Sequence, residues 1–494
     1  MKPRELALLA LPLLVLGAFF AWPLARTLSA AFAGGGAWDW LLGSPFVRAR
    51  VGVAVLQALL SVALTLALAA PLAWLHHRRA LPWGRWQLAL HAAPFAMPVF
   101  VVVFGLQALL GPRGVLADVV GIDLLGGLGA LGAVVVAHAY YNYGFAARLL
   151  HATLERRPHR LEEAAQALGA SPRAAFLRVT LPLLAPTLVA IALLVFLFSF
   201  TSFGVVLFLG EGQVSTLETL LYENMGGAFP AWDRAAALGS LQLAINLALL
   251  ACYMGLRRRE ARLPREPARA PLPARARDRA LAALLAGLAV LPLLLVLAGG
   301  FRVRGAWTLE AWRALLDPAH AAHLGGFDLG RAVGFSLLYA SLSTLAAVTL
   351  TLLLAYGLRS LGGRARRVVE AAAALPLGTS SLLLGLGFAL AFGAGAWLDL
   401  RGQPALVVAA HTIVAFPFVA RVLLPALDQH DRRLDEAAAL LGAPPSHVVA
   451  RVHWPLLRAP LLAAAGFAAA ISLGDFGASL VLMRPDAMSL SIWI

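Results

Sequence analysis

The chain has 494 residues, of which 61% are hydrophobic and 13% charged, and its formal net charge is +15. Together with a mean hydropathy of +0.80, this composition excludes an ordinary soluble enzyme and indicates a membrane protein. The positive charge does not indicate nucleic-acid binding, because the arginines concentrate in alternate loops between hydrophobic segments, as the positive-inside rule describes.

Lysine and cysteine are nearly missing from the sequence, and the scarcity of each excludes certain functional sites. Lysine occurs only at Lys2, so the sequence contains no P-loop with its phosphate-binding lysine. The single cysteine, Cys252, excludes a disulfide within the chain and a cysteine-rich metal site. We therefore expect no ATP hydrolysis and no bound cofactor in this chain.

The first half of the chain contains six hydrophobic segments long enough to span a bilayer. They lie at about 6–32, 51–75, 86–110, 128–150, 183–209 and 232–256. The first is longer than the hydrophobic part of a signal peptide, which favours an uncleaved helix over the alternative of a cleaved signal. Basic loops at 76–79 and 156–157 are predicted to be cytoplasmic, and the loop with Glu211, Glu218 and Glu223 external.

Residues 257–279 separate the two halves. This stretch holds nine arginines and four prolines, so it can neither span a bilayer nor pack as a domain. It is predicted to be a solvated cytoplasmic linker, a reading favoured over a site for anionic lipid or nucleic acid. The expected domains are therefore a permease-like repeat at 1–256, the linker at 257–279 and a second repeat at 280–494.

The second half repeats the first in the same orientation. Its predicted spans lie at about 280–300, 332–357, 368–392, 403–424 and 456–480. His411 follows His138 by 273 residues, whereas upstream Pro376 follows Pro94 by 282. The expected fold is thus an all-α polytopic membrane protein with two tandem repeats of about six transmembrane helices. Because Ile494 aligns with residue 221, the second repeat lacks its final helix, and we expect the sequence to be truncated there.

A short motif occurs once in each half, between hydrophobic segments. Its shared residues are Glu163, Ala164, Ala165 and Gly169 in the first copy, and Glu436, Ala437, Ala438 and Gly442 in the second. Leucine and alanine at i, i+3, i+4 and i+7 form an apolar stripe on one helix face, and acidic residues in the first turn favour the helix dipole. Gly169 and Gly442 are predicted to end the helix, and Pro172 and Pro445 to begin another.

This repeated motif resembles the cytoplasmic signature loop of type I, binding-protein-dependent ABC-importer permeases. In that family the first helix of the loop is the coupling helix, which sits in a groove of the ATPase subunit. The second copy departs from the family pattern where Trp454-Pro455 replaces Leu181-Pro182. The resemblance implies a bacterial inner-membrane permease with two copies of a cytoplasmic ATPase, which carry ATP and Mg²⁺, and an external substrate-binding protein.

A second resemblance concerns the substrate. Residues 199–204 match residues 472–477, and Ser-Thr-Leu-Glu follows at 215–218. Together with the fusion of two halves in one chain, these features resemble the permeases for thiamine and, closely related, for ferric iron. Thiamine, a thiamine derivative or ferric iron is the implied substrate.

The candidate residues for a substrate path are polar groups within the apolar spans. They are Asp475, Ser202, His138, His411 and Tyr141. A carboxylate at membrane depth usually faces a protein interior or a wet pathway, and Asp475 would favour a cationic substrate. The alternative for Asp475 is an ion pair with an arginine such as Arg421, or a cap on a helix broken at Gly474.

Other interpretations of these residues stay open. The two histidines can be hydrogen-bonded helix contacts, a reading preferred over metal ligands, and Tyr140, Tyr141 and Tyr143 are better explained as interfacial anchors than as a substrate cage. An ion-coupled secondary transporter built from parallel repeats is the alternative function class, and a membrane-embedded enzyme is a third.

Overall fold

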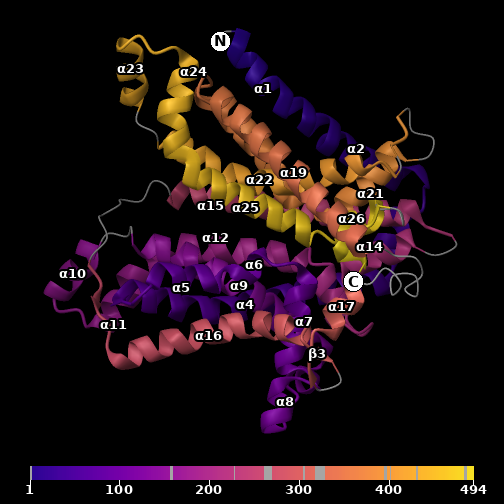
Figure 1. Ribbon diagram of the computed structural model, residues 1–494, viewed down its shortest axis with the longest axis horizontal. Helices are drawn as coiled ribbons and strands as arrows, with labels where there is room; N and C mark the ends of the chain where they lie inside the picture. Colours follow the sequence, from indigo (N-terminus) through magenta and orange to yellow (C-terminus); the bar gives the residue numbers. More distant parts are fainter. Residues whose placement is uncertain are drawn as a thin grey trace. The chain divides into compact units, whose positions relative to one another are not determined.

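The computed structural model describes residues 3–155, 159–226, 229–260, 270–303, 306–316, 329–393, 398–400, 402–429, 432–482 and 487–493. Nearly all of this part of the chain is helical (Figure 1). Ten helices there are long and apolar enough to cross a membrane, or eleven if one sharply bent pair counts as a span. The prediction of an all-α polytopic membrane protein is confirmed.

The helices form two compact units, each described here by itself. Unit 1 comprises residues 1–35 and 316–494, and unit 2 comprises residues 36–315. The elements of unit 1 are α1 (Pro3–Leu16), η1 (Gly17–Ala21), α2 (Trp22–Ala33), α19 (Leu329–Leu358), α20 (Gly363–Ala374), η3 (Leu375–Gly378), α21 (Ser381–Phe392), α22 (Pro404–Asp428), α23 (Arg432–Leu440), α24 (Pro445–Val448), η4 (Val449–His453), α25 (Trp454–Gly474), α26 (Gly477–Leu482) and α27 (Leu490–Trp493).

Unit 2 contains the remaining helices and two very short sheets. Its elements are α3 (Ala37–Gly43), α4 (Pro45–Arg78), β1 (Arg79–Ala80), α5 (Gly84–His91), α6 (Ala93–Ala96), α7 (Val99–Leu110), α8 (Val115–Val120), α9 (Leu124–Leu154), α10 (His159–Ala167), α11 (Pro172–Ala175), η2 (Phe176–Thr180), α12 (Leu181–Phe200), α13 (Gly204–Leu209), α14 (Leu217–Met225), α15 (Trp232–Glu260), β2 (Leu272–Pro273), α16 (Ala276–Gly299), β3 (Arg302–Val303), β4 (Ala306–Trp307) and α17 (Glu310–Leu316).

The two units do not follow the two sequence repeats, because each repeat gives its first helix to the other. Helix α1 packs along α19, and α16 packs along α7 (Figure 1). The same small-residue contact supports both exchanges. A Cβ on Gly105 of α7 would lie 2.6 Å from the carbonyl oxygen of Pro292 in α16, and one on Gly387 of α21 would lie 3.1 Å from that of Pro23 in α2. Glycine at these two positions lets the exchanged helix approach closely.

Alanine is frequent among the buried residues at the helix contacts within each unit. The core of unit 1 joins α19, α22 and α25, and five of its ten buried residues are alanine. The core of unit 2 joins α4, α9 and α12 around Leu150, Ile191 and Val195. Small residues allow helix backbones to approach, which supplies the packing energy where lipid offers no hydrophobic driving force between helices.

Four predicted spans are interrupted in the structure. The segment predicted at 86–110 is divided into α5, α6 and α7, and the one at 368–392 bends by 100° between the α20–η3 pair and α21. The segments at 183–209 and 456–480 are each broken late, after Phe200 and after Gly474. Hydropathy averaged over a whole span does not locate a break of a few residues, so each of these segments is predicted as one span.

The predicted linker is ordered at both of its ends. Helix α15 continues to Glu260, and β2 pairs in parallel with β1 just before α16 begins. Arg79 forms an ion pair with Asp278 at 3.1 Å, which attaches the start of α16 to the end of α4. Residues 261–269 of the linker lie outside the described part of the chain.

Candidate functional site

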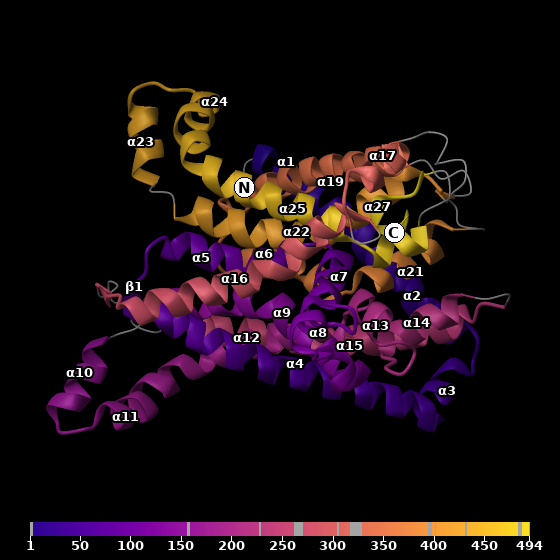
Figure 2. The ribbon, with the colours of Figure 1, turned by 60° about the horizontal axis from the view of Figure 1, so that its bottom comes forward.

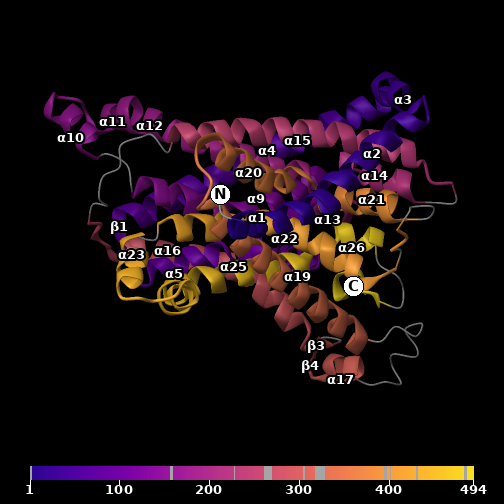
Figure 3. The same cartoon turned by 90° about the horizontal axis from the view of Figure 1, so that it is seen from above.

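The first copy of the repeated motif folds as predicted. Helix α10 ends in a Schellman motif: Gly169 has φ +91°, its N–H donates to Gln166, and Ala170 N–H donates to Ala165. Pro172 then begins α11, whose Ser171 cap accepts a hydrogen bond from the N–H of Ala174. Figure 3 shows α10 and α11 at one end of α12, beyond the long helices of unit 2.

The second copy repeats this geometry. Gly442 has φ +77°, its N–H donates to Ala439, and Ala443 N–H donates to Ala438. Pro445 begins α24, and both α23 and α24 project from the end of α25 (Figure 2). Trp454 begins α25 after one π-helical turn, just as residue 181 begins α12, so the departure from Leu-Pro leaves the backbone unchanged.

The two helices expose apolar side chains on the face that the motif predicted. Glu163 and Ala164 are exposed and Ala165 is half-buried, and Glu436, Ala437 and Ala438 show the same pattern. The leucines that follow are among the most exposed large side chains of the described residues: Leu168 is 90% exposed, and Leu440 and Leu441 are each 89% exposed. Such a combination on a short projecting helix indicates a surface that another protein covers.

The acidic residue before each motif glutamate attaches its helix to neighbouring elements of the same unit. In unit 2, the Thr180 hydroxyl of η2 donates to the Glu162 carboxylate at 2.8 Å. In unit 1, the Asp435 carboxylate accepts from Arg359 at 2.8 Å and contacts the Nε2 atom of His453 at 2.8 Å. From sequence, these acids were expected only to favour the helix dipole, so their anchoring contacts are a finding of the structure.

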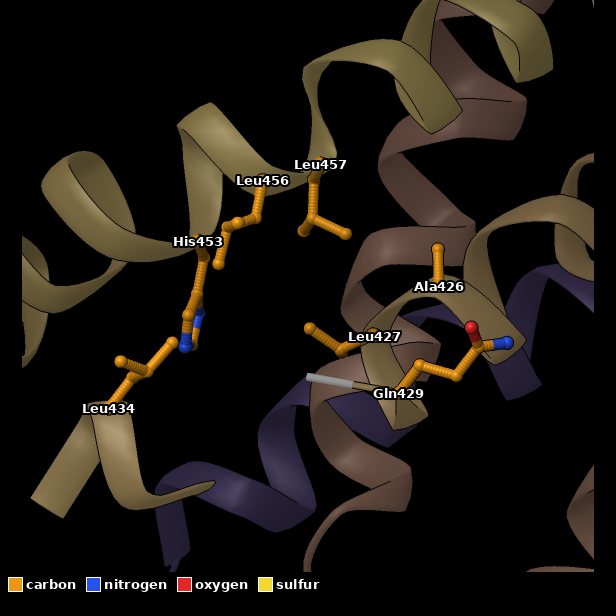
Figure 4. A pocket seen from close by; sticks show the side chains of 7 residues that line it. All are labelled: Ala426, Leu427, Gln429, Leu434, His453, Leu456 and Leu457. Carbon is orange, nitrogen blue, oxygen red and sulfur yellow. The ribbon is translucent and has the colours of Figure 1, made fainter. Parts of the chain in front are cut away.

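A cleft of about 260 Å³ lies beside α23 in unit 1 (Figure 4). Leu434 of α23 and His453 of η4 point toward one another on one side, and Leu427 and Gln429 come from the end of α22 on the other. The cleft lies between α23 and the end of α22, and the contacts of Asp435 with Arg359 and His453 help to hold α23 to its unit.

His411 and Asp475 lie together in unit 1. The Nε2 atom of His411 is 3.3 Å from the Asp475 carboxylate, and both side chains are almost fully buried. The Nδ1 atom of His411 contacts the Ser472 hydroxyl at 2.7 Å. The Asp475 carboxylate accepts a hydrogen bond from the Ser479 N–H at 3.0 Å. Asp475 therefore caps α26 after the break at Gly474, as one alternative stated, and the partner that the structure shows for it is His411 rather than an arginine.

The other path candidates lie in unit 2 and make helix contacts. His138 Nδ1 is 3.4 Å from the Ser61 hydroxyl of α4, and the Tyr141 hydroxyl donates to the carbonyl of Met97 at 2.6 Å. Ser202 is half-buried in the break between α12 and α13. The structure therefore brings two of the five candidates together, and the histidines are hydrogen-bonded helix contacts.

The tyrosines of α9, which are predicted to be interfacial anchors, contact neighbouring helices through their hydroxyls. Tyr140 donates to the carbonyl of Ala289 in the exchanged helix α16 at 2.6 Å, and Tyr143 lies 2.9 Å from His91 Nδ1. Their hydroxyls join α9 to neighbouring helices of the same unit, so they fix the packing of the bundle.

Three buried polar residues are not predicted as such by the sequence. Glu218 was expected in an external loop, yet it lies on α14 with no exposed surface and accepts a hydrogen bond from Gln242 of α15. Asn246 lies one turn further along α15 and is also fully buried. The spacing of Gln242 and Asn246 within an apolar span is the signal that could have found them. Among the described residues, no cluster of three or more His, Cys, Asp or Glu side chains is arranged to hold a metal.

Comparison with known proteins agrees with this geometry. Residues 73–262 and 347–494 match the model of the binding-protein-dependent transport system inner membrane component. The chain belongs to this family. It is thus a multi-pass inner-membrane permease subunit of an ABC importer, and not the component that hydrolyses ATP. The family match decides against the alternative of an ion-coupled secondary transporter.

The similarity to several known proteins extends over nearly the whole chain. The thiamine transport system permease protein ThiP of Brucella abortus (strain 2308) is 30% identical over 474 residues, which cover 92% of this chain and 83% of that protein. The protein of the same name from Escherichia coli (strain K12) is 29% identical over 91% of this chain and 82% of its own length. That of Haemophilus influenzae is 27% identical, with 94% and 86% covered.

Proposed function

We propose that this permease transports thiamine or a thiamine derivative. The proposal of this substrate rests on the similarity to proteins named as thiamine transport permeases, which extends across more than nine tenths of the chain. A separate external binding protein would deliver the substrate, as the family's description indicates.

We further propose that α10 and α23 are the coupling helices and that each docks on one of two identical ATPase subunits in the cytoplasm. Their exposed leucines supply the apolar contact, and Glu163 and Glu436 sit beside it on the exposed side of each helix. ATP and Mg²⁺ would bind to those ATPase subunits. Closure of the ATPase pair would then move both helices and switch the permease between inward and outward access, because the docked face differs between the two states.

The glutamates provide the test of coupling. Glu163→Arg and Glu436→Arg are expected to weaken ATPase association and to lower uptake at least about tenfold, because the reversed charge enters a desolvated contact. Glu223→Arg, an exposed charge reversal on α14, is the control and should leave uptake unchanged. Membrane levels of each variant are measured alongside. If the double variant with Glu163→Arg and Glu436→Arg takes up substrate at the parental rate, the coupling assignment is refuted.

Uptake into proteoliposomes that contain the full complex tests the substrate. Labelled thiamine and labelled ferric iron are compared, each with its own binding protein and with ATP enclosed. ATP-dependent accumulation of thiamine alone is expected. Accumulation of iron alone would refute the substrate while leaving the coupling helices in place.

A further inference from the structure

A fully buried carboxylate of unit 2 lies between two helices that the sequence did not predict to meet. Helix α14 packs along α15 and also contacts α4 (Figure 2). Glu218, in the first turn of α14, has no exposed surface, and the Gln242 amide of α15 donates to its carboxylate. Burying this carboxylate carries a large desolvation cost unless polar groups surround it.

The amides beside Glu218 are incompletely satisfied. Among the described residues, the Gln242 Oε1 atom has no hydrogen-bond partner, and neither Oδ1 nor Nδ2 of Asn246 has one. Both side chains have no exposed surface. Leaving a buried polar group unpaired costs about 1–3 kcal/mol, so the two unpaired amide oxygens in adjacent turns of α15 are acceptors that a bound species would satisfy.

The depth of these residues places them inside the membrane region. Gln242 lies ten residues after Trp232, the first residue of α15, in a helix apolar enough to cross the bilayer. At 1.5 Å per residue this is about 15 Å, roughly half the thickness of the hydrocarbon core. Ionisable groups at that depth usually mark a pathway or a binding site.

The chemistry of the donors favours a cation. A carboxylate and two side-chain amide oxygens are ligands that hard cations prefer, and a carboxylate also pairs with an organic cation. At the position 273 residues after Glu218 the second repeat has Ser491, so the repeat does not require this acid.

We propose that Glu218, Gln242 and Asn246 bind a monovalent cation within unit 2. The cation is either an alkali ion or the organic cation that the permease transports. The assignment of the organic cation rests on the proposed function. Glu218 supplies the charge, and the oxygens of Gln242 and Asn246 complete its coordination.

The test measures thermal unfolding of the full chain in lipid nanodiscs. The added salts are NaCl, KCl and thiamine chloride, each compared with the bulky cation N-methylglucamine at equal ionic strength. At least one of the three should raise the Tm saturably. Glu218→Gln keeps the shape of the side chain and removes its charge, so its apparent affinity should fall at least about tenfold.

Two further variants make the outcome decisive. Asn246→Leu removes the unpartnered amide and should weaken binding of the same cation while retaining or raising the Tm without salt. Ser240→Ala is the matched control, because its buried hydroxyl donates to Ala236 of its own helix, and binding should be unchanged. The proposal is wrong if no cation stabilises the parent, or if Glu218→Gln and Asn246→Leu both bind like the parent. A sodium or potassium effect without a thiamine effect supports the site even if thiamine is not the substrate.

Discussion

The contacts of Asp435 allow a quantitative prediction about the attachment of α23. Its carboxylate accepts from Arg359 and contacts His453, each at 2.8 Å, and its side chain is 26% exposed. A buried hydrogen bond to a charged group contributes about 1.5–3 kcal/mol. Partial exposure reduces each contribution, so we expect Asp435→Asn to destabilise the attachment of α23 by about 1.5–3 kcal/mol in total.

Hydrogen–deuterium exchange measures this attachment directly. A loss of that size raises the population of the detached helix about 10- to 150-fold, and amide exchange across residues 432–440 should accelerate accordingly. Helix α10 of the same molecule provides the internal reference, because its anchor is formed by Glu162 and Thr180. Exchange there should not change.

Asp428→Asn is the matched control for Asp435→Asn. Asp428 also pairs with an arginine, Arg366, but its side chain is 44% exposed, and pairs of that kind contribute about 0–1 kcal/mol. Exchange of α23 should therefore stay near the parental rate. If Asp435→Asn changes exchange less than about twofold, or if Asp428→Asn accelerates it equally, the anchoring argument is refuted.

Two glycines provide further tests of the backbone. Gly442→Ala should destabilise the end of α23 by about 1–2 kcal/mol, because the residue has φ +77° although nothing lies within 4 Å of an added Cβ. Amide hydrogen exchange at the end of α23 measures this destabilisation. An unchanged exchange rate would contradict the predicted backbone strain. Gly144→Ala should lower the Tm by several degrees, because its Cβ would lie 1.7 Å from the carbonyl oxygen of His91. Gly127→Ala in the same helix has free space, and an equal Tm loss there would refute the clash.

Sequence reasoning succeeded where the determinants of structure are local. Helices α10 and α23 could be predicted because a stripe of alanine and leucine, a stopping glycine and a following proline lie within fifteen residues. Gly169 and Gly442 adopt the left-handed conformation for which glycine was required. The family follows from the same residues, since the motif and its repetition are both visible in the chain.

Contacts between distant segments could not be predicted in this way. The exchange of first helices depends on Gly105 meeting Pro292 and Gly387 meeting Pro23, and nothing in an apolar run specifies its neighbour. Glu218 was misplaced for a related reason. An acid near apparent loop residues is usually exposed, and only the packing of α14 against α15 buries it.

The role of Asp475 can now be decided by experiment. Asp475 lies 3.3 Å from His411 and both side chains are almost fully buried, so removing one of them leaves a buried polar group unsatisfied at a cost of about 1–3 kcal/mol. Asp475→Asn should therefore lower the Tm markedly, although the new amide oxygen can still accept from the Ser479 N–H. Replacing His411 by glutamine in the same variant should then cost less than it does in the parent, since the pair is already lost. A variant that keeps the parental Tm and loses thiamine uptake would instead place Asp475 on the substrate path.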